Sequence, residues 1–63
     1  MKDKTATANF TMSFNENSFK KNKIYTYKYK DENKENVLVI SEEGNVQDFP
    51  FSEFDILFTL LTI

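Results

Sequence analysis

The sequence predicts a small, mainly β domain, in which four or five antiparallel strands follow one another as a meander and one short helix or helical turn lies near the C-terminus. Apolar and polar residues alternate with a period of two over 5–14, and again over 23–30. Short polar segments rich in Asn, Asp and Ser separate the apolar runs, as hairpin turns do. Because the strands follow one another without a crossover helix, each is expected to pair with its neighbour in the chain.

The length and composition indicate how such a domain is stabilised. The 63 residues are expected to form a single small domain over 1–63, with 1–4 disordered. The sequence contains no cysteine and no histidine, so a disulfide cannot support the fold. Aromatic residues make up 16% of the chain and are expected to supply most of the core. With one Gly and one Pro, the turns must rely on Asn, Asp and Ser.

The first predicted strand covers 5–14, "TATANFTMSF", where threonine alternates with apolar residues. A turn at 15–18 follows, made of side chains that hydrogen-bond to their own backbone. Phe19 is then expected to anchor the chain in the core before the second strand. The buried face of the first strand is predicted to consist of Ala6, Ala8, Phe10, Met12 and Phe14.

The second predicted strand, 23–30, contains "IYTYKYK", with three tyrosines at alternate positions. Tyr25 and Tyr27 are expected in the core, because so small a domain without cysteine needs large buried rings. Tyr29, at the end of the strand, is expected to be reachable by a partner. The opposite, solvated face of the strand then carries Ile24, Thr26, Lys28 and Lys30.

The middle of the chain predicts two further strands. A polar hairpin loop at 30–36 leads into 37–41, "VLVIS", an apolar run typical of a central, buried strand. The turn 42–45 contains Gly44, the only glycine, where a positive φ is expected. The fourth strand, 45–49, places Val46 on one face with either Asp48 or Phe49, and Pro50 ends it.

The C-terminal segment "FSEFDILFTLLTI" allows two interpretations. Ser52 and Asp55 resemble a capping box, and apolar residues recur at helical spacing from Phe54. The favoured interpretation is a helix or helical turn from 52 to about 58. The alternative is one helical turn at 52–57, followed by a strand over 58–63 that closes against the first strand. A helix that is apolar all round would need a partner to cover it, so 54–63 is also a candidate homodimer interface.

Charge is distributed unevenly along the chain. Residues 20–30 contain five lysines and no acid, whereas 31–63 contain eight acids and one lysine. The remaining residues balance, so the formal net charge is −2. The division predicts either cross-strand ion pairs between neighbouring strands or a functional charged patch.

The residue inventory argues against catalysis and metal binding. Without histidine or cysteine, the usual bases and thiol nucleophiles are missing. The acid pairs Glu42–Glu43 and Asp31–Glu32 are adjacent in sequence, so on a strand their side chains point to opposite faces. We therefore predict no enzyme, no catalytic residue, no metal site and no cofactor. No signal peptide is visible, and the apolar stretch 54–63 is too short to span a bilayer, so a cytoplasmic protein that does not contact membranes is expected.

Residues 19–58 resemble the small SH3-like β-barrel proteins of bacteriophages and mobile elements. The similarity lies in "KNKIYTYKY", a polar loop, and "NVLVISEEGNVQDFPFSEF". The resemblance implies a small barrel with a helical turn before the last strand. The residues that carry it are Lys23, Tyr25, Val39, Gly44, Phe49, Pro50 and Phe54.

Protein binding is the predicted function. The resemblance, the small size and the acidic charge suggest a phage-encoded protein that inhibits a host protein, in the manner of anti-CRISPR and other anti-defence inhibitors. One alternative is single-stranded nucleic-acid binding through Lys20, Lys21, Lys23, Lys28 and Lys30 beside the tyrosines. The other is a self-assembling structural protein. The candidate partner-binding residues are Tyr29, Glu42, Glu43, Asp48, Phe51 and Asp55.

Overall fold

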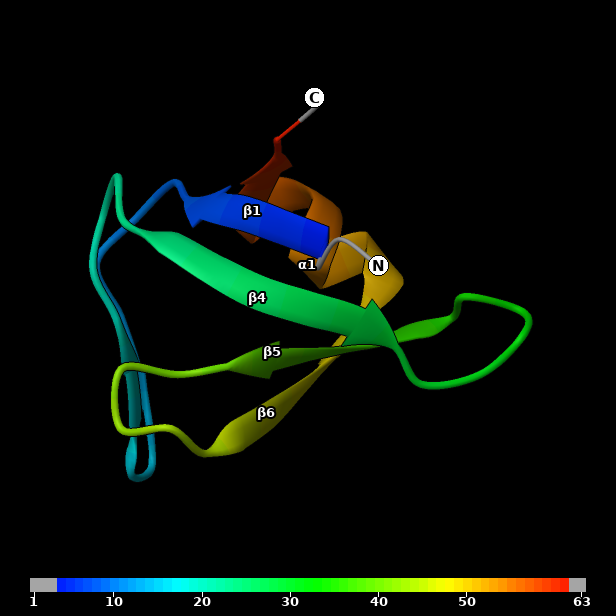
Figure 1. The fold of residues 1–63 in the computed structure, drawn as a ribbon, viewed down its shortest axis with the longest axis horizontal. Helices are drawn as coiled ribbons and strands as arrows, with labels where there is room; N and C mark the ends of the chain where they lie inside the picture. The colour runs from blue at the N-terminus through cyan, green and yellow to red at the C-terminus, as the bar shows by residue number, and fades with distance from the viewer. Residues whose placement is uncertain (1–3, 62–63) are drawn as a thin grey trace.

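The computed structural model describes residues 4–61, which form seven strands and one helix (Figure 1). Five strands make an antiparallel sheet in the order β6-β5-β4-β1-β7, and β2 and β3 make a separate two-stranded sheet. Because β6 and β7 are the edges of the larger sheet within these residues, it is an open antiparallel sheet and not a closed barrel. β4, β5 and β6 follow one another as the predicted meander, whereas β1 lies between β4 and β7 and not beside its neighbour in the chain. The elements are β1 (Lys4–Ala8), β2 (Met12–Phe14), β3 (Asn17–Phe19), β4 (Ile24–Tyr29), β5 (Asn36–Ile40), β6 (Val46–Pro50), α1 (Phe51–Leu57) and β7 (Phe58–Leu60).

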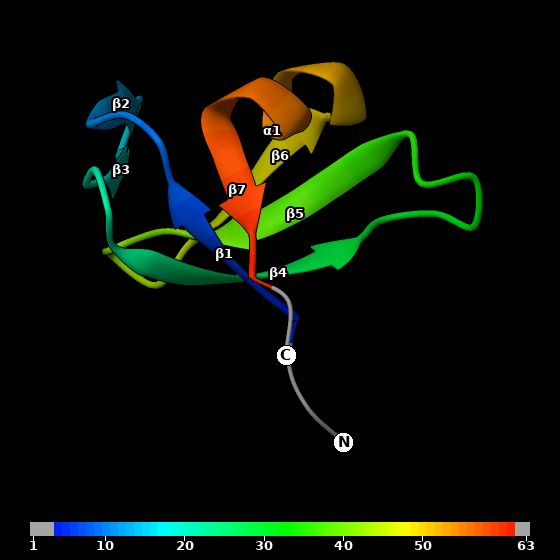
Figure 2. The same ribbon diagram turned by 90° about the horizontal axis from the view of Figure 1, so that it is seen from above.

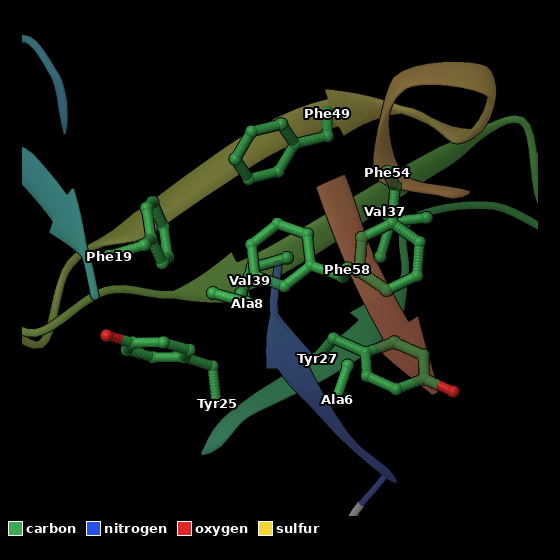
Figure 3. Packing of buried hydrophobic residues seen from close by; sticks show 10 residues of the cluster. All are labelled: Ala6, Ala8, Phe19, Tyr25, Tyr27, Val37, Val39, Phe49, Phe54 and Phe58. Carbon is green, nitrogen blue, oxygen red and sulfur yellow. The ribbon is translucent and has the colours of Figure 1, made fainter. Parts of the chain in front are cut away.

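One side of the sheet is covered. The β2–β3 hairpin and α1 lie on the same side of β4 and β5 (Figure 2). Aromatic rings fill the space between them (Figure 3), and Phe19 lies among four others, with ring centroids 5.1 Å from Tyr25 and 5.7 Å from Phe49. Edge-to-face packing of this kind adds to the free energy gained by burying apolar area. The buried apolar residues are Ala6, Ala8, Phe19, Tyr25, Tyr27, Val37, Val39, Phe49, Phe54 and Phe58.

The core confirms the predicted orientation of β4. Tyr25 and Tyr27 are 6% and 8% exposed, whereas Lys28 on the alternate position is exposed. The predicted central, buried strand over 37–41 is confirmed in part: β5 lies between β4 and β6, but of its apolar residues only Val37 and Val39 are buried. The other face of β5 carries Leu38 and Ile40, which no described element covers.

The predicted strand over 5–14 is broken. β1 ends at Ala8, and Phe10, predicted to be in the core, is 51% exposed. The chain leaves the sheet because Asn9 bonds to the C-terminal region. Its amide N–H and its side-chain Nδ2 donate to the carbonyls of Leu57 and Ile56 at 2.8 and 3.0 Å, and Thr59 Oγ1 donates to its Oδ1 at 2.7 Å.

The turns use the residues that the composition predicted. Gly44 has φ +87°, and Asn15 and Asn22 also adopt positive φ, at 55° and 70°. Asparagine tolerates the left-handed region better than most side chains, so it replaces glycine in these turns. Lys34, in the loop between β4 and β5, is a fourth positive-φ residue.

The C-terminal segment follows the alternative interpretation. α1 ends at Leu57, and β7 then pairs with β1, with Ala8 opposite Phe58 and Ala6 opposite Leu60. The predicted capping box is wrong, because Pro50 is the N-cap and no side chain caps the helix. Instead, the amide N–H of Phe51 donates to the carbonyl of Glu35 at 2.7 Å.

Parts of two terminal predictions lie outside the described residues. The disorder predicted for 1–4 is wrong at Lys4, which begins β1, and the rest of that range is not among the described residues. The predicted strand and dimer interface reach residue 63, and 62–63 are likewise outside. Of the candidate dimer interface, Phe54 and Phe58 belong to the core, whereas Ile56, Leu60 and Leu61 are exposed.

Candidate functional site

Two of the predicted partner-binding acids hold the fold together. The Ser18 amide N–H and hydroxyl donate to the two carboxylate oxygens of Glu43, at 2.8 and 2.5 Å. Glu42 accepts the Tyr25 hydroxyl at 2.7 Å and forms an ion pair with Lys23 at 3.1 Å. Both carboxylates therefore connect the β5–β6 turn to neighbouring strands.

A buried polar cluster continues these contacts between the β2–β3 hairpin and the main sheet. Asn17 Nδ2 donates to Gln47 Oε1 at 2.7 Å, and Ser41 Oγ donates to Asn17 Oδ1 at 3.0 Å. The Glu42 amide N–H donates to the Ser18 carbonyl at 3.1 Å. We call Asn17, Ser18, Ser41, Glu42, Glu43 and Gln47 the hairpin latch.

The latch changes the acidity of its members. Hydrogen bonds from the Ser18 hydroxyl and amide lower the pKa of Glu43 from 4.5 to about 2. Donation by the Tyr25 hydroxyl, and then the Lys23 ammonium, lowers the pKa of Glu42. Burial raises the pKa of Tyr25, and the neighbouring Glu42 carboxylate raises it further. Both carboxylates therefore have pKa values below the ordinary one, and that of Glu43 is well below it.

The remaining predicted partner-binding residues do not gather on one surface. Asp48 lies on β6 and pairs with Lys30 at 3.0 Å. Asp55 and Phe51 are exposed on α1, on the covered side of the sheet, with Phe51 at 38% exposure. Tyr29 is half-buried, its ring 5.8 Å from that of Tyr27. The predicted acidic binding surface is thus dispersed over both sides of the molecule.

The lysines of the predicted nucleic-acid surface do not gather on one surface either. Lys23 pairs with Glu42, beside the ends of the neighbouring strands β4 and β5, as one interpretation of the charge pattern predicted. Lys30 pairs with Asp48 on β6, which is separated from β4 by β5. Lys20 and Lys21 are exposed beside the β3–β4 turn, and Lys28 points away from the tyrosine rings of β4. Base stacking and phosphate contact would therefore require opposite faces of one strand.

The surface that does gather side chains is the outer face of the sheet, opposite α1 and β2–β3. Residues paired in register point to the same side, so Val46 joins Ile40, and Asp48 joins Leu38, which in turn faces Lys28. Ile24, Ile40 and Val46 are 63%, 43% and 55% exposed. We call Ile24, Thr26, Lys28, Leu38, Ile40, Val46 and Asp48 the outer face.

A hollow of about 350 Å³ lies on this outer face. Leu38, Ile40 and Val46 supply its apolar lining, and Lys28 supplies its charged group. Lys4 also borders the hollow, but it pairs with Tyr27 and its ammonium lies over the Tyr29 ring on the inner side of the sheet. The volume of the hollow lies at the lower end of the range of roughly 300–1,000 Å³ for ligand pockets in proteins. Such a hollow could accept a few side chains of a larger partner.

Sequence reasoning predicted a solvated face on β4 but missed its continuation over β5 and β6, because a run of four apolar residues is typical of a buried strand. The signal that could have revealed it was the shortage of covering elements. A chain of 63 residues with one short helix and one small hairpin can cover one side of a five-stranded sheet. Apolar residues on the other side then remain exposed.

Comparison of the chain with protein-family models, with curated proteins and with solved structures found no match. Within residues 4–61, no helix is long and apolar enough to cross a membrane. The same residues contain no group of three or more acidic side chains placed to hold a metal ion.

Proposed function

We propose that the chain is a non-enzymatic protein-binding module whose binding surface is the outer face. The observation that carries this proposal is the apolar strip of half-buried Leu38 and exposed Ile40 and Val46 around a hollow. Contiguous exposed apolar surface on a small protein commonly marks an interaction site. The polar and charged residues beside it match the mixed character of protein interfaces.

Strand propensity alone does not account for this strip. β-branched residues favour strands, but threonine satisfies that preference without exposing much apolar area. The half of the sheet formed by β4 and β1 uses threonine in this way, where Thr5 pairs with Thr26. The half formed by β5 and β6 instead pairs Ile40 with Val46. Three of the outer-face apolar residues, Leu38, Ile40 and Val46, therefore lie around the hollow, whereas Ile24 pairs with Thr7 and does not line it.

The finer parts of the functional hypothesis rest on the resemblance of residues 19–58 to SH3-like phage proteins. Inhibition of a host protein, as anti-defence proteins do, remains a prediction, as does a location in the host cytoplasm. The proposal of an outer-face binding surface is independent of both, because it uses only the exposed residues of β4, β5 and β6.

Affinity capture with a matched pair of variants tests the proposal. Ile40→Gln removes an apolar side chain from the outer face, and Ile56→Gln makes the same change on α1, where Ile56 is 66% exposed. We expect a protein retained by the wild type and by Ile56→Gln to be lost with Ile40→Gln. Retention by both variants, or loss with Ile56→Gln alone, would contradict an outer-face binding surface.

A further inference from the structure

The hollow on the outer face combines an apolar lining with positive charge. Lys28 lies at its border, beside Leu38, Ile40 and Val46. A lysine ammonium group on its long flexible stem can approach an anion while its methylenes cover apolar surface. The surroundings of the Lys28 ammonium then decide whether the hollow keeps its charge.

Among the described residues, no acid forms an ion pair with Lys28. The ion pairs of residues 4–61 join Lys23 to Glu42 and Lys30 to Asp48, so Lys28 takes part in neither. The Lys4 ammonium lies 4.9 Å from the centroid of the Tyr29 ring, in a cation–π contact on the inner side of the sheet, so it does not contribute to the charge of the hollow. Asp48, the acid of the outer face, is already paired. The hollow is therefore positively charged.

The charge of the hollow is opposite to that of the whole chain, which has a formal net charge of −2. This contrast bears on what could occupy the hollow. A second copy that docked by the same face would bring its own Lys28 close to that of the first, and like charges at an interface are unfavourable. An anionic occupant would instead gain attraction.

We infer that the outer face binds a segment of a partner protein that presents a carboxylate next to a large apolar side chain. This inference rests on the proposed function and specifies the chemistry of the partner. The apolar side chain occupies the hollow between Leu38, Ile40 and Val46, and the carboxylate pairs with Lys28. The apolar contact supplies affinity, and the charge selects among apolar segments.

Titration calorimetry at low salt with three probes of equal length tests the inference. The probes are a capped peptide alternating leucine and aspartate, its counterpart alternating leucine and lysine, and an oligothymidylate. We expect the leucine–aspartate peptide to bind at least about tenfold more tightly than the leucine–lysine peptide, a difference of about 1.4 kcal/mol. Binding of the leucine–aspartate peptide should weaken as salt is added.

Reversing the charge of Lys28 should change the affinities of the two peptides in opposite directions. Lys28→Glu should weaken the leucine–aspartate peptide about tenfold and strengthen the leucine–lysine peptide. Lys21→Glu is the matched control, because it makes the same change at an exposed turn residue away from the outer face. We expect that control to change either affinity less than about twofold, as exposed charges acting at a distance do. Amide spectra of both variants check that they are folded.

The other possible outcomes distinguish a failure of this inference from a failure of the proposed function. If the leucine–aspartate peptide does not bind, or binds equally to Lys28→Glu, the inference is overturned. The proposed function then stands as long as protein capture still depends on Ile40. Preferential, Lys28-dependent binding of the oligothymidylate would overturn the inference in favour of nucleic acid. Capture that is independent of Ile40 would overturn the proposed function itself.

Discussion

The inner and outer faces of the sheet use the same strands in different ways. On β4 and β5, the inner positions carry Tyr25, Tyr27, Val37 and Val39, all buried against other parts of the chain. The outer positions of the same strands include apolar residues of similar size that contact no covering element. Alternation therefore defines two faces, but the number of covering elements decides which face becomes a core. The uncovered face is available for a partner.

The largest effect is expected from a core ring. Phe54 is 1% exposed, and its ring lies 5.1 Å from those of Tyr27 and Phe58. Phe54→Ala should cost about 3–5 kcal/mol of unfolding free energy. A domain of this size has roughly 3–9 kcal/mol in total, from about 0.05–0.15 kcal/mol per residue. Urea denaturation followed by circular dichroism measures the loss.

Phe51→Ala is the matched control for this variant, because Phe51 belongs to the same helix and is 38% exposed. The loss of unfolding free energy in Phe51→Ala should be clearly smaller than in Phe54→Ala. Equal losses for the two substitutions would mean that Phe54 is not the residue that attaches α1 to the sheet.

A smaller loss is expected in the hairpin latch. Asn17→Ala removes the acceptor of Ser41 Oγ and the donor to Gln47 Oε1, and Ser41 is 5% exposed. Leaving such a buried group without a partner costs about 1–3 kcal/mol. Denaturation of Asn33→Ala, a change in the exposed loop between β4 and β5, provides the comparison. An Asn17→Ala variant as stable as Asn33→Ala would show that the latch does not stabilise the hairpin.

The latch also predicts a dependence of stability on pH. The folded pKa of Glu43, about 2, lies below its ordinary 4.5, so the unfolded chain binds the proton more readily. The stabilisation by Glu43 is therefore complete above pH 4.5 and is lost as the pH falls from 4.5 towards 2. Glu43→Gln should lower the melting temperature at pH 7 and flatten its decline over this acidic window. If the melting temperature of Glu43→Gln declines as steeply as that of the wild type, other carboxylates cause the pH dependence.

The smallest effect on stability is expected on the outer face. Ile40→Gln replaces a side chain that is 43% exposed, and exposed substitutions usually change stability by less than about 0.5 kcal/mol. Ile40→Gln should instead weaken partner binding, whereas Asn17→Ala in the latch should mainly lower the unfolding free energy. A loss in unfolding free energy comparable to that of Asn17→Ala would mean that Ile40 acts mainly within the fold.

Much of the fold could be predicted from local pattern. Period-two alternation identified the buried tyrosines of β4, and the turn signal identified Gly44. The break after β1 could not be predicted, because the groups that bond to the Asn9 side chain lie 47 and 50 residues further along the chain. The prediction of a capping box at Ser52 and Asp55 was wrong for a related reason. The Phe51 amide N–H finds its acceptor in the loop between β4 and β5.

The candidate site was less predictable than the fold. Glu42 and Glu43 looked like free acids of a turn because Ser18, which accounts for the low pKa of Glu43, belongs to a different hairpin. The outer face was not recognised on β5, because the apolar run 37–40 has the pattern of a buried strand. Which residues remain available for a partner depends on tertiary packing, and a single sequence carries little direct information about it.

Amide chemical-shift mapping of the labelled protein with its captured partner tests most directly whether the outer face is the binding surface. We expect the largest changes at Thr26, Lys28, Leu38, Ile40 and Val46, around the hollow, and small changes along α1. Changes centred on Phe51 and Asp55, or on the turn that carries Glu42 and Glu43, would contradict it.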